Sequence, residues 1–481
     1  MKNMTLEHIA AVCGGTYIGN EADKKREIKG AVIDSRLVEK DYLFIPVRGE
    51  KVDGHSFIPS VFEKGALAVF SEEKLENPAG PYILVENTLD AMKKIAADYR
   101  RGLDIKVVGI TGSVGKTSTK EMIASVLAQK YNVLKTEGNL NNEIGLPLTI
   151  FKIREEHQVA VLEMGISEFG EMDRLSTMAN PDICVITNIG LCHLENLITR
   201  DGILKAKTES FAHLTPDGIA VLNGDDDKLC DKKVVNGKPA VFYGIEKAAK
   251  VAETEEGTKT LAEKTVYATN VEAVGLTGTK AALHYPSKET GGEVTMEVTI
   301  PIAGEHNVYN ALAAIAVSLE NGISMDAIRA GLAHFTGTNR RFEKKGEVNG
   351  FTIIDDYAHH PHEIEATLKT AQNYPHKTLW CIFQPHTYTR TKAFLPQFAE
   401  ALSLADKVIL ADIYAARETD TLGISSEDIV KLLKEKGKEA WYLPTFDEIE
   451  KFVMEHCTQG DLLITMGAGD VVNVGENLLA K

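Results

Sequence analysis

The segment KVVGITGSVGKTSTKEMIASVL, from Lys106 to Leu127, constrains the fold of this chain more than any other. Its apolar, β-branched first part predicts a buried strand, and its second part predicts a helix. A short loop that contains Gly112 and Gly115 joins the two. Glycines in such a loop let backbone amides turn toward an anion, and the helix adds the positive end of its dipole. The segment therefore predicts a phosphate-binding loop that holds a nucleoside triphosphate.

The residue types of this loop match the groups that a triphosphate needs. The Lys116 side chain can reach the β- and γ-phosphates, and the Thr117 hydroxyl can bind Mg²⁺. Ile110 stands where the usual pattern begins with glycine, so the match is to the variant TGSxGKTS. The predicted nucleotide contacts in the loop are Gly112, Ser113, Gly115, Lys116, Thr117 and Ser118.

Length, charge and cysteine usage narrow the class of protein. A chain of 481 residues is too long for one core and predicts about three domains. The formal net charge of -16 argues against a general nucleic-acid binder, which needs a basic surface. No apolar run approaches the roughly 20 residues that span a bilayer, and the amino-terminal residues are too polar for a signal peptide. Six cysteines without CxxC pairs indicate free thiols, so we expect a cytoplasmic protein without nucleic-acid or membrane partners.

Hydrophobic patterning predicts an α/β protein with three domains. We expect a small α/β domain over 1–103, a central domain with a parallel sheet over 104–336, and a Rossmann-like domain over 337–481. The central strands are expected at IKVVGI, VAVLEMG, ICVITNIG and IAVLNGD, with helices between them. Residues 229–300 hold short alternating runs, which predict an antiparallel β-rich extension of the central domain.

Several polar residues follow the predicted central strands. Glu163 and His193 come after neighbouring strands, so both should lie at the edge of the sheet that carries the phosphate loop. Glu163 is either a Mg²⁺ ligand beside Thr117 or an exposed acid, and His193 is either a ligand or structural. Asn141 and Asn142 either cap turns or hold oxygen atoms of a substrate.

Several motifs occur in order along the chain: TGSVGKTSTKE, NLNNEIGLPLT, VLEMGISEFGEM, ITNIGLCHLEN, KAKTES and GEHNVYNALAA. Together they resemble the Mur ligases, the ATP-dependent amino-acid and peptide ligases of peptidoglycan precursor synthesis. The resemblance covers essentially the whole chain. It implies three α/β domains, ATP and two Mg²⁺ ions, and a UDP-N-acetylmuramoyl acceptor that is joined to an amino acid or dipeptide.

The two ends of the chain resemble different members of this family. DSR, VRGEKVDGH and NNEIGLPLT look most like the member that adds D-alanyl-D-alanine to UDP-N-acetylmuramoyl-tripeptide. NRRFEKKGEVNGFTIIDDYAHHPHE, FQPHTYTRT and DIYAARETD are similar to the member that adds L-alanine to UDP-N-acetylmuramate. We expect the dipeptide-adding activity, with the alanine-adding activity as the alternative. A non-catalytic nucleotide-binding regulator is a third class.

The resemblance also implies roles for single residues. Thr117 and Glu163 would bind one Mg²⁺, and His193 and a carbamylated Lys207 would bind the other. Lys205 competes with Lys207, because the motif here is AKTE where the family has AKGE. The implied catalytic residues are Lys116, Glu163, His193 and Lys207. The other implied contacts are Asn307, Asn310, Arg341 and Asp356 for the nucleotide, and Ser35, Arg36, Asn141, Asn142, His386 and Arg390 for the substrates.

The implied reaction has two steps. A carboxylate of the UDP-sugar attacks the γ-phosphorus of ATP and gives an acyl phosphate and ADP. An amine then displaces phosphate through a tetrahedral intermediate, and an amide bond forms. We expect a monomer that performs this chemistry where its domains meet.

Overall fold

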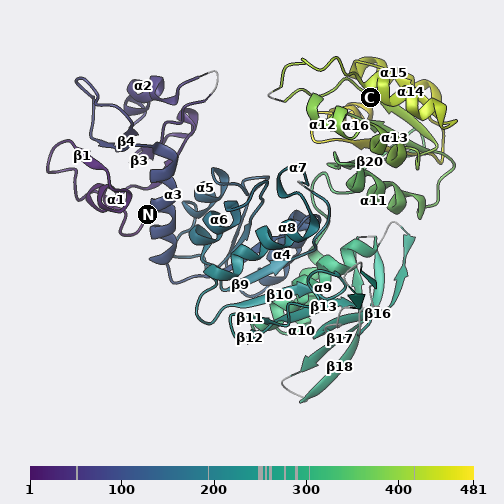
Figure 1. Ribbon diagram of the computed structural model, residues 1–481, viewed down its shortest axis with the longest axis horizontal. Coiled ribbons are helices and arrows are strands. Elements are labelled where there is room, and N and C mark those ends of the chain that lie inside the picture. The colour runs from purple at the N-terminus through teal and green to yellow at the C-terminus, as the bar shows by residue number, and fades with distance from the viewer. Residues whose placement is uncertain are drawn as a thin grey trace. The chain divides into compact units, whose positions relative to one another are not determined.

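The computed structural model describes residues 1–49, 52–192, 194–247, 253–254, 257–258, 263–275, 278–287, 291–302, 304–416 and 418–480. The chain forms two compact units, whose elements are labelled in Figure 1. Unit 1 contains Met1–Val271, Ala281–Val298 and Val308–Phe335, and unit 2 contains Glu272–Lys280, Thr299–Asn307 and Thr336–Lys481. In the part of the chain that the structure describes, no helix is both long enough and apolar enough to cross a bilayer.

Unit 1 begins with a five-stranded sheet of short strands. In spatial order these are β1 (Thr16–Ile18), β5 (Tyr82–Leu84), β4 (Ala68–Ser71), β3 (Tyr42–Phe44) and β2 (Gly30–Val32). Only the β1–β5 pair is antiparallel. The accompanying helices are α1 (Leu6–Cys13), α2 (Ile58–Glu63), α3 (Thr88–Arg101) and the 3₁₀ helices η1 (Ser35–Leu37) and η2 (Gly54–Phe57).

Helix α3 joins this sheet to the rest of unit 1. Ile95 of α3 packs in one apolar cluster with Val107 and Leu162 of the central sheet. The Arg100 side chain is buried, and its Nε donates to the Ala179 carbonyl oxygen at 3.0 Å. The amino-terminal residues therefore share a core with the central sheet.

The central sheet of unit 1 has nine strands. Their order is β18 (Gly292–Ile300), β17 (Thr279–Ser287), β16 (Val266–Ala273), β13 (Val241–Ile245), β10 (Ile219–Asn223), β9 (Ile183–Ile186), β6 (Lys106–Thr111), β8 (Val159–Glu163) and β7 (Val133–Lys135). Each neighbouring pair of strands from β7 to β16 is parallel. The antiparallel extension predicted for 229–300 is therefore wrong for β13 and β16, since both continue the parallel sheet. β13 has a buried apolar centre, which suits a strand paired on both sides.

The helices of this region follow the predicted alternation with strands. They are α4 (Lys116–Leu127), α5 (Gly145–Ile150), α6 (Glu171–Ala179), α7 (Leu194–Leu197), α8 (Arg200–Thr208), the 3₁₀ helix η3 (Glu209–His213), α9 (Glu305–Glu320) and α10 (Met325–His334). Four short strands pair in twos: β11 (Val234–Val235) with β12 (Lys238–Pro239), and β14 (Glu253–Thr254) with β15 (Gly257–Thr258). Because β6 lies between β8 and β9, the carboxyl ends of these three strands meet at one edge of the sheet.

Unit 2 is built on a six-stranded sheet with apolar clusters on its two faces. The strands, in spatial order, are β19 (Glu343–Val348), β20 (Phe351–Asp356), β24 (Leu462–Met466), β21 (Leu379–Phe383), β22 (Lys407–Leu410) and β23 (Glu439–Tyr442). β19 is antiparallel to β20, and the rest are parallel. The helices are α11 (Pro361–Gln372), α12 (Tyr388–Ala393), α13 (Leu395–Leu402), α14 (Ser426–Glu435), α15 (Phe446–His456) and α16 (Val472–Ala480). This is the predicted Rossmann-like alternation.

Candidate active site

The predicted phosphate loop lies between β6 and α4. Gly112 has φ +146° and Gly115 has φ +85°, so both occupy backbone conformations that glycine adopts readily. A Cβ atom at Gly112 would lie 1.9 Å from the Thr187 hydroxyl oxygen, so only glycine fits there. Gly115 is the N-cap of α4 and supplies no side-chain cap, which leaves amides of the first turn available to an anion.

The segment after β9 holds this loop in place. The Thr187 hydroxyl donates to the Val114 carbonyl oxygen at 2.6 Å. The Asn188 side chain accepts from the Val114 amide at 2.9 Å and donates to its carbonyl oxygen at 2.9 Å, while the Ser113 amide donates to the Asn188 carbonyl at 3.0 Å. Sequence analysis missed these two residues, although the TNIG motif contains them.

Lys116 begins α4, and its side chain bends over the loop. Its Nζ donates to the carbonyl oxygens of Gly112 at 2.9 Å and of Ser113 at 3.2 Å. Ser118 lies in the first turn of the same helix. The loop thus brings together a cation, uncapped amides and a helix N-terminus, which is the arrangement that binds phosphate groups.

Glu163 ends β8 and is buried at 2% exposure beside the loop. Its Oε1 accepts hydrogen bonds from the Thr117 hydroxyl at 3.3 Å and from Asn141 Nδ2 at 2.8 Å. Its Oε2 is buried and has no hydrogen-bond partner among the described residues. A buried carboxylate oxygen that accepts no hydrogen bond, next to a threonine hydroxyl, is a ligand set that suits a hard cation such as Mg²⁺.

A buried lysine lies behind this carboxylate. Lys120 Nζ is 3.7 Å from Glu163 Oε2 and donates to the Thr136 carbonyl oxygen at 2.7 Å. The Thr136 hydroxyl in turn accepts from the Glu163 amide at 2.9 Å. Sequence analysis did not single out Lys120, because a lysine one helical turn after Lys116 looks like an ordinary solvent-facing residue.

Lys207 and Lys205, the two candidates for the second Mg²⁺ site, lie in different environments. Lys207 is 2% exposed, and its Nζ donates to the Gly112 carbonyl oxygen at 3.0 Å. Burial, followed by the charge of Lys116, lowers the pKa of Lys207 to about 7. Lys205 is exposed and lies 6.0 Å from the centre of the Phe169 ring. The geometry therefore favours Lys207, whereas His193 lies outside the described residues.

Asn310 and Asn307 lie on α9 and are both buried. The Asn310 Oδ1 accepts from the Thr119 hydroxyl at 2.9 Å, and a Cβ atom at Gly115 would lie 3.0 Å from it. Asn310 thus packs against the phosphate loop. Asn307 Nδ2 lies 3.1 Å from His306 Nε2.

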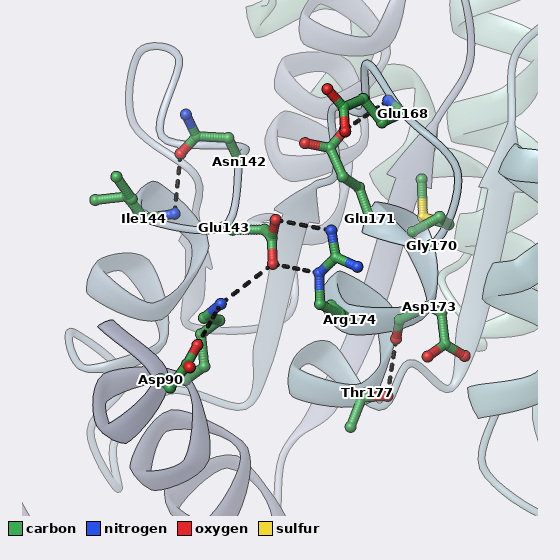
Figure 2. Close-up of polar contacts among 12 residues, drawn as sticks. Asp90, Asn142, Glu143, Ile144, Glu168, Gly170, Glu171, Asp173, Arg174 and Thr177 are labelled. Carbon is green, nitrogen blue, oxygen red and sulfur yellow. Dashed lines mark hydrogen bonds and ion pairs between the residues drawn. The ribbon is translucent and has the colours of Figure 1, made fainter. Parts of the chain in front are cut away.

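The predicted substrate residues of unit 1 make mostly local contacts. Asn142 Oδ1 accepts from the Ile144 amide at 3.1 Å (Figure 2) and from the amide of Gly145, the first residue of α5, at 2.8 Å. Arg36 is exposed and pairs with Asp34, and this guanidinium lowers the pKa of Asp34 to about 2. Ser35 begins η1, and its carbonyl oxygen accepts from Lys64.

In unit 2, Asp356 ends β20 and is buried. Its two oxygens accept from the amides of Phe342 at 2.7 Å and Ala358 at 2.8 Å, and burial raises its pKa to about 6. The Arg341 guanidinium lies 5.3 Å from the centre of the Tyr357 ring. The positive charge of Arg341 favours the ionised form of Asp356.

His386 and Arg390 lie next to each other in unit 2. Arg390 Nη1 is 3.3 Å from His386 Nδ1, and the His386 ring stacks on Tyr414. Burial, with a smaller effect of the Arg390 charge, lowers the pKa of His386 to about 4. At neutral pH the pair therefore presents an uncharged imidazole beside a guanidinium.

Comparisons with known proteins identify the family. The Mur ligase family catalytic domain matches residues 27–100, the Mur ligase middle domain matches 110–318, and the Mur ligase glutamate ligase domain matches 340–469. The chain belongs to the Mur ligase family. It is an ATP-dependent amide-bond ligase of peptidoglycan synthesis. The predicted family and fold class are thereby confirmed, and a purely regulatory role is not supported.

Relatives of both predicted kinds are found. The UDP-N-acetylmuramate--L-alanine ligase of Lachnoclostridium phytofermentans is 41% identical over 378 residues, 78% of this chain and 76% of the relative. The UDP-N-acetylmuramoyl-tripeptide--D-alanyl-D-alanine ligase of Bacillus subtilis is 38% identical over 381 residues, 78% of this chain and 76% of the relative.

Solved structures resemble the whole chain. MurF from Acinetobacter baumannii has a TM-score of 0.80 and 26% identity, and the match covers 99% of both chains. MurF ligase from Thermotoga maritima in complex with ADP has a TM-score of 0.74 and 27% identity, with 93% of this chain and 96% of that chain covered.

Proposed function

We propose that this ligase adds D-alanyl-D-alanine to UDP-N-acetylmuramoyl-tripeptide. The observation that carries the proposal is the match to MurF along 99% of both chains. The motifs DSR, VRGEKVDGH and NNEIGLPLT in unit 1 support the same substrate. The second candidate is the addition of L-alanine to UDP-N-acetylmuramate, which is favoured by the 41% identity to a ligase of that name.

In the proposed reaction, the phosphate loop orients ATP for attack by the substrate carboxylate. The loop amides and Lys116 would hold the β- and γ-phosphates, so that the carboxylate oxygen attacks the γ-phosphorus and ADP leaves. The amine then attacks the acyl carbon, a proton leaves the nitrogen, and phosphate departs. We assign Asn307, Asn310, Arg341 and Asp356 to the nucleotide, and Ser35, Arg36, Asn141 and Asn142 to the UDP-sugar.

His386 and Arg390 are proposed to meet the incoming amino substrate. The substrate carries a carboxylate, and a guanidinium is its preferred partner because it offers two parallel donors. Because His386 Nδ1 accepts from Arg390, the neutral imidazole carries its proton on Nε2, which can donate a hydrogen bond to the substrate without repelling its amine.

We propose two Mg²⁺ ions at this site, and the described residues Thr117 and Glu163 fit the first of them. Thr117 and Glu163 would hold one ion, and His193 and carbamylated Lys207 would hold the other. Bound Mg²⁺ neutralises phosphate charge that would otherwise repel the carboxylate. Lys207 suits carbamylation, because a buried amine with a pKa of about 7 is largely uncharged at slightly alkaline pH and can react with CO₂.

Phosphate release tests the substrate assignment. The purified chain is given ATP and Mg²⁺ with either UDP-N-acetylmuramoyl-tripeptide and D-alanyl-D-alanine, or UDP-N-acetylmuramate and L-alanine. We expect amine-dependent release with the first pair, and release with only the second pair would replace the proposal by the alternative. Lys116→Ala should lower the rate at least about 100-fold, because a charged contact to the transferring phosphoryl group is lost. An unchanged rate in this variant would refute the role of the loop.

The carbamate has its own test. Lys207→Ala should lose activity, and high bicarbonate should not restore it, because the variant has no amine to carbamylate. Full activity of Lys207→Ala would refute the carbamate assignment.

A further inference from the structure

Glu143 lies where three elements of unit 1 meet. It belongs to the loop before α5, and it accepts two hydrogen bonds from Arg174 of α6, Nε to Oε1 at 2.5 Å and Nη2 to Oε2 at 3.0 Å. Lys93 of α3 donates to Oε1 at 3.4 Å and also pairs with Asp90 at 2.9 Å. Figure 2 shows Glu143 facing Arg174, with Asp90 on a neighbouring helix. One carboxylate thus connects the amino-terminal helix α3, the loop and α6.

The contact with Arg174 has the geometry of a strong ion pair. Both carboxylate oxygens of Glu143 are engaged by the guanidinium, and the Glu143 side chain is 24% exposed. The hydrogen bonds from Arg174 lower the pKa of Glu143 below its ordinary value. Such two-point pairs fix orientation, whereas a single exposed contact does not. Glu137, at the start of the same loop, makes only such a single contact with Lys152, and both side chains are exposed.

The loop transmits the position of Glu143 to the phosphate site. Asn141, two residues earlier, donates to Glu163 at 2.8 Å. The residues that flank Asn141 and Glu143 are closely packed, because a Cβ atom at Gly145 would lie 2.4 Å from Leu140 Cα. We therefore expect a displacement of Glu143 to displace Asn141 as well, because tightly packed residues cannot move independently.

Helix α6 extends the connection to the other side of the site. The amides of Gly170 and Asp173, at the start of α6, donate to the Glu209 carboxylate at 3.2 and 3.3 Å. Glu209 follows Lys207 by two residues, so α6 fixes the end of the helix that carries Lys207. Arg174 lies on this first turn of α6, beside the labelled Gly170 and Asp173 (Figure 2).

We propose that Glu143 is a positioning residue of the phosphate site. Through its own loop it holds Asn141 against Glu163, and through Arg174 it holds α6 and thereby Lys207. The Glu143–Arg174 ion pair thus keeps Glu163 and Lys207, the two groups assigned to the metal ions, at a fixed separation. Neither Glu143 nor Arg174 is itself assigned to the nucleotide or to a metal ion. The inference rests on the proposed function, since it deepens the description of the same site.

The decisive variant is Glu143→Gln, which keeps the shape of the side chain but removes its charge. Binding of a non-hydrolysable ATP analogue with Mg²⁺, measured by calorimetry, should weaken about 3- to 10-fold, a change typical of residues that act through a neighbour. The KM for ATP should rise by a similar factor, while the KM for the amine stays the same. The matched control is Glu137→Gln in the same loop, which should bind the analogue like the unaltered chain.

A double substitution separates positioning from simple stabilisation. Because only part of the effect of Glu143 passes through Asn141, Glu143→Gln should weaken binding by a smaller factor in the Asn141→Ala variant than in the unaltered chain. Should Glu143→Gln fold poorly, Arg174→Lys keeps the charge, loses the two-point contact and should weaken binding in the same direction. Unchanged analogue binding in Glu143→Gln or in Arg174→Lys, or full additivity with Asn141→Ala, would overturn the inference. Failure of the unaltered chain to turn over either substrate pair would instead count against the proposed function, because analogue binding does not depend on the substrates.

Discussion

The buried amine of Lys207 predicts how stability depends on pH. Burial lowers its pKa from 10.5 to about 7 in the folded chain, while the unfolded chain keeps the ordinary value. Between pH 7 and pH 10.5 unfolding therefore takes up a proton. The free energy of unfolding must therefore rise with pH across this window. Below pH 7 the folded chain bears the full cost of burying the charged Lys207 amine.

The size of the effect follows from the same two pKa values. The interval from 10.5 to about 7, at about 1.4 kcal/mol per pH unit, gives an upper bound of about 5 kcal/mol. Local relaxation reduces such penalties, so we expect about 2 to 4 kcal/mol. Lys207→Met removes the charge and keeps the volume. The Gly112 carbonyl oxygen still accepts from Lys116 in this variant, so the substitution leaves no new orphaned acceptor there.

Urea unfolding followed by circular dichroism at pH 7 and pH 10, in buffer free of CO₂, measures this difference. Lys207→Met should be more stable than the unaltered chain at pH 7, and the two should converge by pH 10. Bicarbonate should then stabilise only the unaltered chain, if its amine is carbamylated. Two unfolding curves that stay equally far apart from pH 7 to pH 10 would refute the assignment of a lowered pKa.

Two further substitutions test the loops around the site. Gly112→Ala should lower the free energy of unfolding by about 2 to 4 kcal/mol and abolish nucleotide binding, because its Cβ atom would meet Thr187. Gly138 has φ +53° and open space around it, so Gly138→Ala should lower the free energy of unfolding by only about 1 kcal/mol. Thermal unfolding measures the stability of the two glycine variants, and calorimetry measures their nucleotide binding. Equal stability and equal binding in the two variants would contradict this reasoning. Asn142→Ala should cost about 1 kcal/mol through loss of its hydrogen bond from the first amide of α5, and Asn142→Asp should recover stability. If Asn142→Asp also recovers full phosphate release, Asn142 only stabilises the start of α5 and does not contact substrate.

Local patterns predicted the elements that depend on local chemistry. The phosphate loop was predictable because glycine spacing, an apolar strand and a helix lie together in one segment. The strands of both parallel sheets were predictable because buried strands are continuous apolar runs. Glu163 and Thr117 could be paired because the carboxyl ends of neighbouring parallel strands meet at one edge.

The features that sequence analysis missed depend on residues far apart in the chain. Lys120 looked like a surface residue, but its Nζ contacts Thr136, which follows β7, and Glu163 at the end of β8. The direction of β16 is set by its pairing with β13, and alternating polarity alone does not specify a partner. The contact between Glu143 and Arg174 joins residues on separate elements, and single charged residues carry no signal of their partners.

The shared core beneath helix α3 has a consequence for how such a chain can be inherited. A gene exchange that replaced only the first 103 residues would have to reproduce the packing of Ile95 and the bonds of Arg100, or leave the Ala179 carbonyl oxygen without its buried donor. The segment of unit 2 from β19 to α16 has apolar clusters of its own, so this segment can be acquired whole. A mosaic ancestry, in which the carboxy-terminal third came from a different lineage than the rest, is therefore the kind of recombination that this architecture tolerates.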